Sequence, residues 1–202
     1  ALADKLALGD VNVAVEADTD DEIGDLMRSF EKMTDSIRDK AAAAEQIAAG
    51  NLTVEVEARS ANDVLANSLK QVIITLRALV AEAGMLTNAS VNGKLDVRGN
   101  ADNFKGGYRD IVKGINDTLD AVIGPLNVAA EYIDRISKGD IPPKVTDSYN
   151  GDFNEIKNNL NQCIDGLGGL VEANDVLQKM AMNDYTVPVT GKYQGVFAEV
   201  GG

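Results

Sequence analysis

Apolar residues recur at steps of three and four along four long segments of this chain, and a shorter, alternating pattern fills the segments between them. Steps of three and four place apolar side chains on one face of an α-helix. The pattern therefore predicts four long helices joined by extended connectors. The first should run for about 28 residues, from a cap at Thr19 backed by Glu22 to Ala48. The others should run from a cap at Ser60 or Asn62 to Leu86, from Phe104 to Ile136, and from Phe153 to Ala181.

A short polar turn precedes each alternating segment and recurs at a nearly fixed distance. The first residues of the five turns lie 41, 43, 46 and 44 positions apart. An apolar residue opens the next helical pattern 14 positions after four of the turns and 11 positions after the third. Five copies with matching spacing indicate a repeat array. The turns are Gly9-Asp10-Val11, Gly50-Asn51-Leu52, Gly93-Lys94-Leu95, Gly139-Asp140-Ile141 and Asn183-Asp184-Tyr185, and the opening residues are Ile23, Val64, Phe104, Phe153 and Phe197.

The connectors alternate apolar and polar residues, as in Val11, Val13 and Val15 of the first copy. One face of each connector is therefore expected to lie against the helices. The turn glycine is expected just past a helix end, in the left-handed conformation. A connector of about 13 residues is long enough to return the chain to a parallel helix, whereas an antiparallel pair needs only two to five residues.

Each predicted helix carries one narrow apolar seam, which repeats as heptads. The heptads are interrupted by doubled steps of four near Met33–Ala41 and at Ile111–Ile115–Leu119, where one copy passes into the next. A helix with a single narrow seam is not stable alone in water and needs partners along its length. The chain is therefore predicted to be a coiled-coil bundle interrupted by regular connectors.

Composition excludes several classes of function. The 202 residues include 32 acidic and 19 basic side chains, so the net charge of −13 disfavours nucleic acid and anionic lipid as partners. The chain has no His and a single Cys, which removes imidazole chemistry, internal disulfides and the common metal sites. No phosphate loop or nucleophile motif is present, so we expect no catalytic residue, no cofactor and no metal. No apolar run approaches the roughly 20 residues that span a bilayer, and no signal peptide is visible.

Three further features allow more than one interpretation. The acidic run 18–22 fits a helix cap better than a calcium loop, because Ile23 and Ser29 stand where the loop needs a glycine and an acid. Cys163 lies in heptad register, so it is expected to be a buried structural thiol. Asn174 either fixes the helix register from the seam or faces solvent.

Three glycines interrupt the last predicted helix, at Gly166, Gly168 and Gly169. Each costs up to about 1 kcal/mol relative to Ala in a helix. They form either a soft joint or a site of close backbone packing, and close packing is the preferred interpretation.

The repeated pattern resembles the HAMP domain, a signal-relay module of bacterial chemoreceptors and sensor kinases. The resemblance is carried by a helix ending in Gly-(Asp/Asn)-(Val/Leu/Ile), an alternating connector, and a heptad helix opening on Asp21-Glu22-Ile23-Gly24. In the fourth copy, Pro125 resembles the proline that opens a HAMP first helix. The second helix of that copy opens on Asp152-Phe153-Asn154-Glu155, which again includes a glutamate. The second copy lacks the glutamate, and the third has a shorter connector without an acidic pair before Phe104.

The resemblance covers essentially the whole chain and implies an all-α fold of concatenated parallel dimeric four-helix bundles with extended connectors. Units are expected at 1–39, 40–81, 82–122, 123–167 and 168–202. The first and last are partial, which indicates a piece of a longer array. Residues expected to carry structural or relay roles are Gly9, Glu22, Gly24, Met33, Ile37, Gly50, Gly93, Ile115, Pro125, Gly139, Glu155 and Asn174.

The predicted function is a non-catalytic relay in the cytoplasmic part of a methyl-accepting chemotaxis protein or sensor histidine kinase. Its partners would be a second, parallel copy of the chain and the adjacent sensor and output domains. Any anchor in the inner membrane would lie in parts of the parent protein not present here. Two alternatives are a structural coiled-coil spacer, which needs no repeated connectors, and a helical ligand-binding sensor, which needs pocket-forming aromatics that the aliphatic seam lacks.

Overall fold

The structure is a computed structural model that describes residues 2–14 and 19–199. These residues form helices and connectors without a β-strand, so the all-α fold class is confirmed. The helices are α1 (Leu2–Ala7), α2 (Glu22–Ala48), α3 (Val64–Val91), the 3-10 helix η1 (Ala101–Asn103), α4 (Gly107–Ser137), α5 (Gly151–Ala181) and α6 (Val196–Glu199). The chain divides into two compact units, residues 1–115 and residues 116–202.

The four long helices agree with the predicted ones, but three of their starting points were wrong. Asp21, and not Thr19, caps α2, and Asp63, in place of Ser60 or Asn62, caps α3. Phe104 is buried in extended backbone before α4 instead of opening it. The cause lies in Gly106, whose φ of +52° turns the chain immediately before the first residue of α4.

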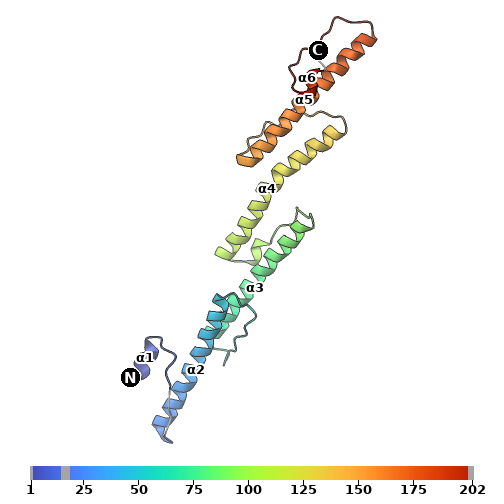
Figure 1. Cartoon of the computed structure of the whole chain (residues 1–202). Coiled ribbons are helices and arrows are strands. Elements are labelled where there is room, and N and C mark those ends of the chain that lie inside the picture. Colours follow the sequence, from blue (N-terminus) through green and yellow to red (C-terminus); the bar gives the residue numbers. More distant parts are fainter. Residues whose placement is uncertain (1, 15–18, 200–202) are drawn as a thin grey trace. The chain divides into compact units, whose positions relative to one another are not determined.

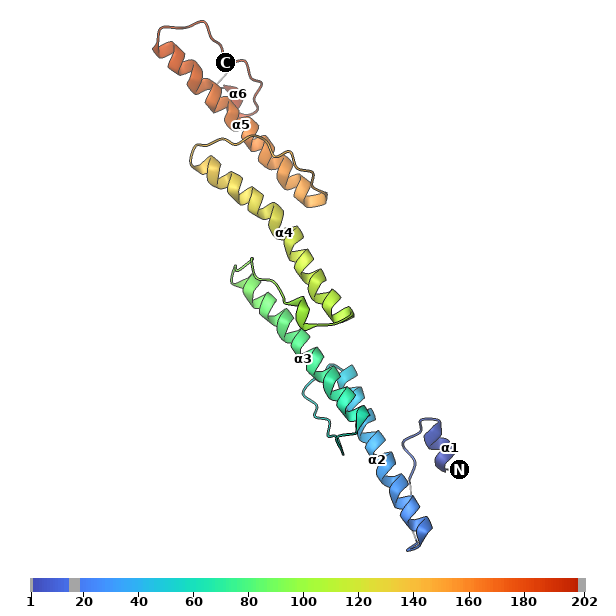
Figure 2. The same cartoon turned by 180° about the vertical axis from the view of Figure 1, so that it is seen from behind.

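Within the first compact unit, the end of α2 lies beside the start of α3, and the two helices run in the same direction (Figures 1 and 2). The return connector between them packs its alternate residues inward, so the predicted inward face is confirmed there. The buried cluster joins Ala43 of α2, Val56 of the connector, and Ala66 and Ile73 of α3. In the first connector Val13 is also buried, whereas Val15 lies outside the described residues.

The second compact unit repeats this arrangement with the end of α4, the connector 140–150 and α5. Pro142 and Val145 of that connector are buried. A small cavity of about 10 Å³ remains between the three segments, lined by Pro125 and Val128 of α4, Val145 and Tyr149 of the connector, and Phe153 and Leu160 of α5.

Helix α4 continues through Pro125, although a proline cannot donate a backbone hydrogen bond to the residue four positions earlier. The helix predicted from Phe104 to Ile136 spans this proline, and the structure keeps one helix of 31 residues. Each of α2, α3, α4 and α5 thus joins two successive turns of the repeat without a break.

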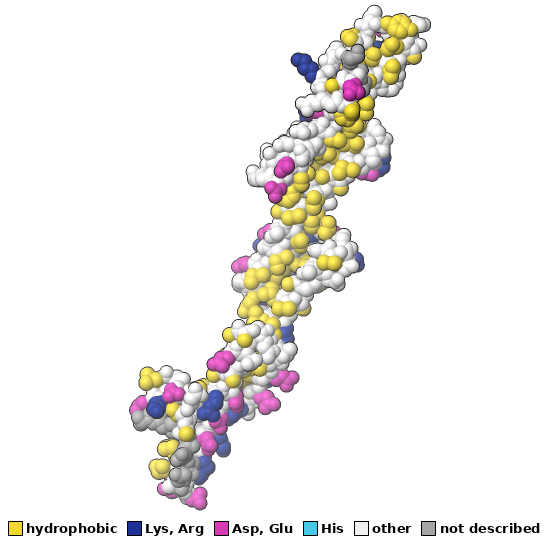
Figure 3. Space-filling model, viewed as in Figure 1, with side chains coloured by type: hydrophobic (Ala, Val, Ile, Leu, Met, Phe, Trp, Pro, Cys, Tyr) yellow, Lys and Arg dark blue, Asp and Glu magenta, His cyan; other side chains and the backbone are white. Residues whose placement is uncertain are grey.

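The predicted seams remain uncovered in the single chain. In Figure 3, apolar side chains gather on exposed surfaces of the long helices. Each such side chain contributes about 1.5–3 kcal/mol when fully buried, so this surface is costly in water. The exposed seam residues include Ile23, Leu26, Met33 and Ile37 on α2, Leu65 and Val72 on α3, Ile111, Val122, Leu126 and Ile133 on α4, and Ile156, Leu170 and Leu177 on α5.

Candidate functional site

The candidate site is distributed, because the same turn and connector recur five times along the chain. In each turn, the first residue donates its N–H to the carbonyl three positions back, and the next residue donates to the carbonyl five positions back. The N···O distances of all ten bonds are 2.9 or 3.0 Å. This is the Schellman arrangement that ends a helix and reverses the chain.

The turn residues have the left-handed conformation, as predicted. The φ angles are +88° at Gly9, +85° at Gly50, +71° at Gly93 and +81° at Gly139. The fifth turn uses Asn183 at +65°, the one non-glycine residue with positive φ in the described part of the chain. Asparagine tolerates this region better than most residues, so the turn is preserved.

The residue after the turn directs the start of the connector. The side chains of Asp10, Asn51 and Asp184 each accept the N–H two residues later, at 3.0–3.1 Å. In the fourth copy the corresponding position is Pro142, which has no N–H. Asp140 instead pairs with Arg135 at 2.7 Å, and this pair lowers the pKa of the Asp140 carboxyl.

Helix α2 begins at a carboxylate that serves as its cap. Asp21 accepts the N–H of Gly24 at 3.0 Å and the hydroxyl of Thr19 at 2.6 Å. These two bonds, that of Thr19 first, lower the pKa of the Asp21 carboxyl. A Cβ at Gly24 would overlap the carbonyl oxygen of Thr19, so only glycine fits. Glu22 is exposed; Asp18 of the acidic run lies outside the described residues.

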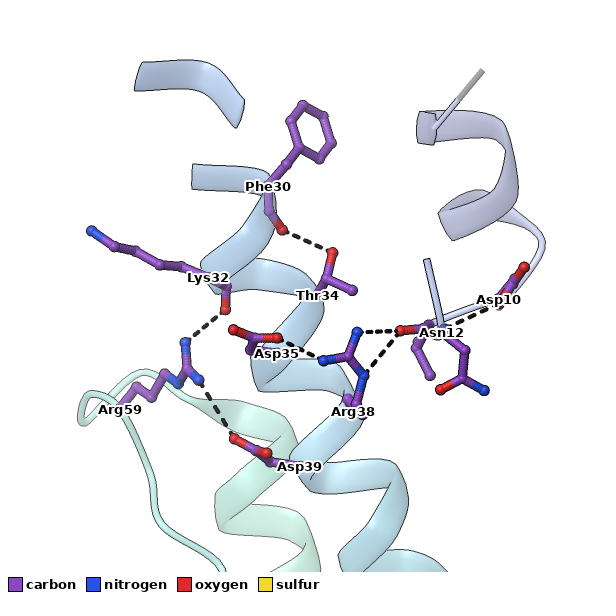
Figure 4. A network of polar contacts seen from close by, with 10 residues as sticks. Asp10, Asn12, Phe30, Lys32, Thr34, Asp35, Arg38, Asp39 and Arg59 are labelled. Atoms are coloured by element: carbon purple, nitrogen blue, oxygen red, sulfur yellow. Dashed lines mark hydrogen bonds and ion pairs between the residues drawn. The ribbon is translucent and has the colours of Figure 1, made fainter. Parts of the chain in front are cut away.

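Arginines on the second helix of a copy hold the first two connectors. Arg38 donates to the carbonyl of Val11 at 2.9 and 3.2 Å and pairs with Asp35 at 2.8 Å (Figure 4). Arg77 donates in the same way to the carbonyl of Leu52 at 2.5 Å. Val11 and Leu52 each lie two residues after their turn glycine, so the two contacts are equivalent.

Arg59 extends this anchoring in the opposite direction, from the second connector to α2. Its guanidinium donates to the carbonyl of Lys32 at 2.6 Å and lies 3.6 Å from Asp39 (Figure 4). The same stretch of α2 includes Thr34, which is almost fully buried and donates to the carbonyl of Phe30. The region of the predicted stutter at Met33–Ala41 is therefore also where the first two connectors attach to α2.

Glutamates on the first helix of a copy hold the third and fifth connectors. Glu82 accepts the N–H of Asn100 at 2.5 Å. Glu172 accepts the N–H and hydroxyl of Thr190 at 2.7 and 2.8 Å, the N–H of Gly191 at 3.0 Å, and the hydroxyl of Tyr193 at 2.7 Å. Led by the Thr190 N–H, these donors lower the pKa of Glu172 from 4.5 to about 2.

The fourth connector is held by an amide. Asn161 of α5 accepts the N–H of Val145 at 2.8 Å and donates to its carbonyl at 3.0 Å. Close by, Lys144 pairs with Asp165 at 2.7 Å. Every connector is therefore fixed to a helix of its own chain by at least one side chain, although the residue type differs between copies.

The three glycines of α5 lie under two aromatic rings of the last copy. A Cβ at Gly166 would stand 2.8 Å from the Phe197 ring, and a Cβ at Gly169 would stand 3.0 Å from the Tyr193 ring. At Gly168 the nearest ring atom is 4.0 Å away. This geometry supports close packing over a soft joint.

The residues singled out from the sequence do not meet at one point. The turn glycines recur along the chain, Met33 and Ile37 lie on the exposed seam, and Ile115 is half-buried. Their proposed relay roles stay predictions, as do those of Glu155 and Asn174, which are exposed. Cys163 is exposed in the single chain. Its predicted burial on the heptad seam would require the second copy of the chain and stays a prediction.

The anchoring side chains Arg38, Arg77, Glu82, Asn161 and Glu172 were missed, because they lie on polar faces outside the apolar pattern. One feature of the sequence could have indicated two of them, because Glu82 and Glu172 each lie eleven residues before the turn residue of their copy.

One helix in the described part of the chain, α3, is long and apolar enough to cross a membrane by length and composition alone, with a window of mean hydropathy 1.4. The expectation that no run approaches this length was therefore wrong. Helix α3 is apolar on several sides because it carries seam positions and also packs against connectors, as Ile73 and Leu86 do. No cluster of three or more potential metal ligands occurs among residues 2–14 and 19–199.

Repeated helix–turn–connector units, joined by continuous helices with an uncovered apolar seam, define a tandem array of helical modules. Residues 1–39 and 103–169 match the HAMP domain family, and these two segments cover just over half of the chain. The chain belongs to the HAMP domain family and carries its domains in tandem.

A 73-residue segment is 42% identical to a protein of Acetivibrio thermocellus named "Putative sensory transducer protein". The segment is 36% of this chain and 13% of that relative, so the chain spans a small part of the relative's length. No solved structure matches the chain.

Proposed function

We propose that this chain is a non-catalytic signal relay between an upstream sensor and a downstream output domain of a bacterial chemoreceptor-type protein. Membership of the HAMP family and the similarity to a sensory transducer support this proposal. In the parent receptor the array would lie on the cytoplasmic side, and a second copy of the chain would complete each of the five predicted units as a parallel four-helix bundle.

The uncovered seam is the observation that carries the proposal. Seam residues such as Ile23 and Ile133 are 58% and 61% exposed in the single chain, and the stripe recurs on all four long helices. A repeating stripe on parallel helices fits a second copy in the same register, because equivalent heptad positions then meet along the whole length. Packed cores of this kind switch between discrete arrangements, which suits them to pass on a rotation or tilt.

The solution mass tests the dimer. Light scattering is expected to give twice 21.4 kDa. Val72→Glu, which places a charge on the seam of α3, should reduce the mass toward that of one chain. The matched control is Ile74→Glu, two residues and about 200° away on the same helix, where Ile74 is already 57% exposed. A monomeric wild-type chain, or equal effects of the two variants, would contradict the seam dimer and favour a sensor that folds within one chain.

A further inference from the structure

A lysine is buried in the second unit of the array, at the contact between α2 and the start of α3. Lys40 is only 6% exposed, and with Thr34 it makes up the buried polar residues found in the described part of the chain. Its ammonium group lies 2.6 Å from the hydroxyl of Ser36, 3.3 Å from the carbonyl of the same residue, and 3.2 Å from the carboxylate of Asp63. A buried cation is therefore fully partnered within one chain.

Asp63 connects three elements through one carboxylate. One oxygen accepts the N–H of Ala66 at 3.1 Å and caps α3, and the other accepts the N–H of Arg59 at 3.1 Å at the end of the connector. The ion pair with Lys40 adds α2. The backbone bonds from Ala66 and Arg59, with a smaller contribution from Lys40, lower the pKa of the Asp63 carboxyl.

The repeat makes this lysine unusual. Lys40 lies ten residues before its turn glycine, and the same position holds Ala83, Ala129 and Ala173 in the three following copies. A small apolar residue therefore suffices at this point of the helix pair. The second copy carries a buried charge where its neighbours have a methyl group, and a buried charge is costly unless it is paired.

Buried ion pairs add little to stability, but removal of one partner is strongly destabilising because the other charge is left unpaired. They can instead select one arrangement of packed elements. A one-residue change of register turns a helix face by about 100° and would separate Lys40 from Asp63. We propose that Lys40 and Asp63 form a register lock, which holds the second unit in one arrangement of α2 against α3 until a signal separates them.

The surroundings of Lys40 offer a second position for its charge. An open cavity of about 290 Å³ lies beside it, lined by Asp39, Glu55, Glu57 and Arg59. The two connector carboxylates, Glu55 and Glu57, are alternative acceptors for an ammonium group that leaves Asp63. Lys40 can thus be paired both in the locked arrangement, with Asp63, and in the released one, with Glu55 or Glu57. This inference rests on the proposed relay, although both charges of the lock belong to the same chain.

Hydrogen exchange in the intact 202-residue chain tests the lock directly. The substitution Lys40→Met keeps a long, unbranched side chain and removes its charge. Exchange of the Arg59 and Ala66 amides, which donate to Asp63, should become about tenfold faster, as expected for loss of a charged hydrogen-bonding partner. Lys32→Met changes an exposed side chain of the same helix and keeps the backbone carbonyl that accepts the Arg59 guanidinium, so it should leave these amides unchanged. Unchanged exchange in Lys40→Met would overturn the proposal.

A distance measurement separates a lock from a contact that only stabilises. Spin labels at Gln46 and Gln71, both exposed, report the placement of α2 against α3 in a Cys163→Ala background diluted with unlabelled chain. The wild type should give one distance, and Lys40→Met a second population. A single unchanged distance in Lys40→Met would contradict the lock even if stability falls. A monomeric mass would contradict the relay and leave the result on the lock intact.

Discussion

Individual residues account for the differences between copies of this repeat. Pro142 removes the N–H that Asp140 would otherwise accept, so Asp140 turns to Arg135. Asn183 replaces glycine and keeps the turn, because asparagine also tolerates positive φ. The glycines of α5 lie under aromatic rings, so their small size is used for packing and not for flexibility.

Substitution by alanine should have different effects on stability at two neighbouring glycines of α5. In Gly168→Ala the new methyl group lies 4.0 Å from its nearest ring atom, so the gain in helix propensity, up to about 1 kcal/mol, should raise the melting temperature. Gly169→Ala places a methyl group 3.0 Å from the Tyr193 ring, whose hydroxyl is held by Glu172. It should give no such gain or lower the melting temperature. Thermal unfolding followed by circular dichroism checks this, and an equal rise in both variants would contradict the packing described for Tyr193.

At the scale of elements, the five connectors differ in the type of residue that fixes each of them to a helix. Arginines hold the first and second, glutamates the third and fifth, and an asparagine the fourth. The fifth connector depends on the ionised carboxylate of Glu172, whereas the fourth is held by the uncharged amide of Asn161.

Acid should release the fifth connector before the fourth. The pKa of Glu172 is lowered from 4.5 to about 2, so its contact is fully present above pH 4.5, weakens as the pH falls below that value, and is lost below about pH 2. Amide exchange at Thr190 and Gly191, corrected for the intrinsic effect of pH, should therefore rise between pH 4.5 and 2, while that at Val145 changes less.

Glu172→Gln is expected to give the fast exchange of Thr190 already at pH 7. Glu155→Gln, at an exposed position of the same helix, serves as the control. Slow exchange of Thr190 in Glu172→Gln at pH 7 would show that the carboxylate does not hold this connector.

The repeat period, the four long helices and the left-handed turns could be predicted from the sequence, because they follow from apolar spacing and from the turn residues. The caps at Asp21 and Asp63 were misplaced, since several polar residues precede each helix and local pattern does not choose among them. The position of Phe104 depended on the backbone angle at Gly106, which the spacing does not encode. The anchoring side chains and Lys40 depend on contacts between residues 16 to 27 positions apart, which become visible only once the connectors are folded back.

On the scale of the whole molecule, the continuous helices and the exposed seam suggest how a change at one copy reaches the next. Deletion of Asp35, within the stutter region of α2, turns the preceding part of the helix by about 100° relative to the rest. In a receptor that contains these units, this deletion should change the output of the protein. Light scattering should still show a dimer, because the seams on either side of the deletion remain. Unchanged output with the dimer retained would count against the relay.

The continuity of α2 to α5 has a consequence for how such a chain can grow. Each long helix ends one copy of the pattern and begins the next, so a cut at a unit boundary divides a helix. A duplication that runs from one turn to the next turn adds a whole helix and a whole connector, and leaves every existing helix intact. Arrays of this kind can therefore lengthen or shorten by whole periods of 41 to 46 residues with little disturbance to folding. Most other insertions within a helix shift the apolar seam and are expected to be selected against.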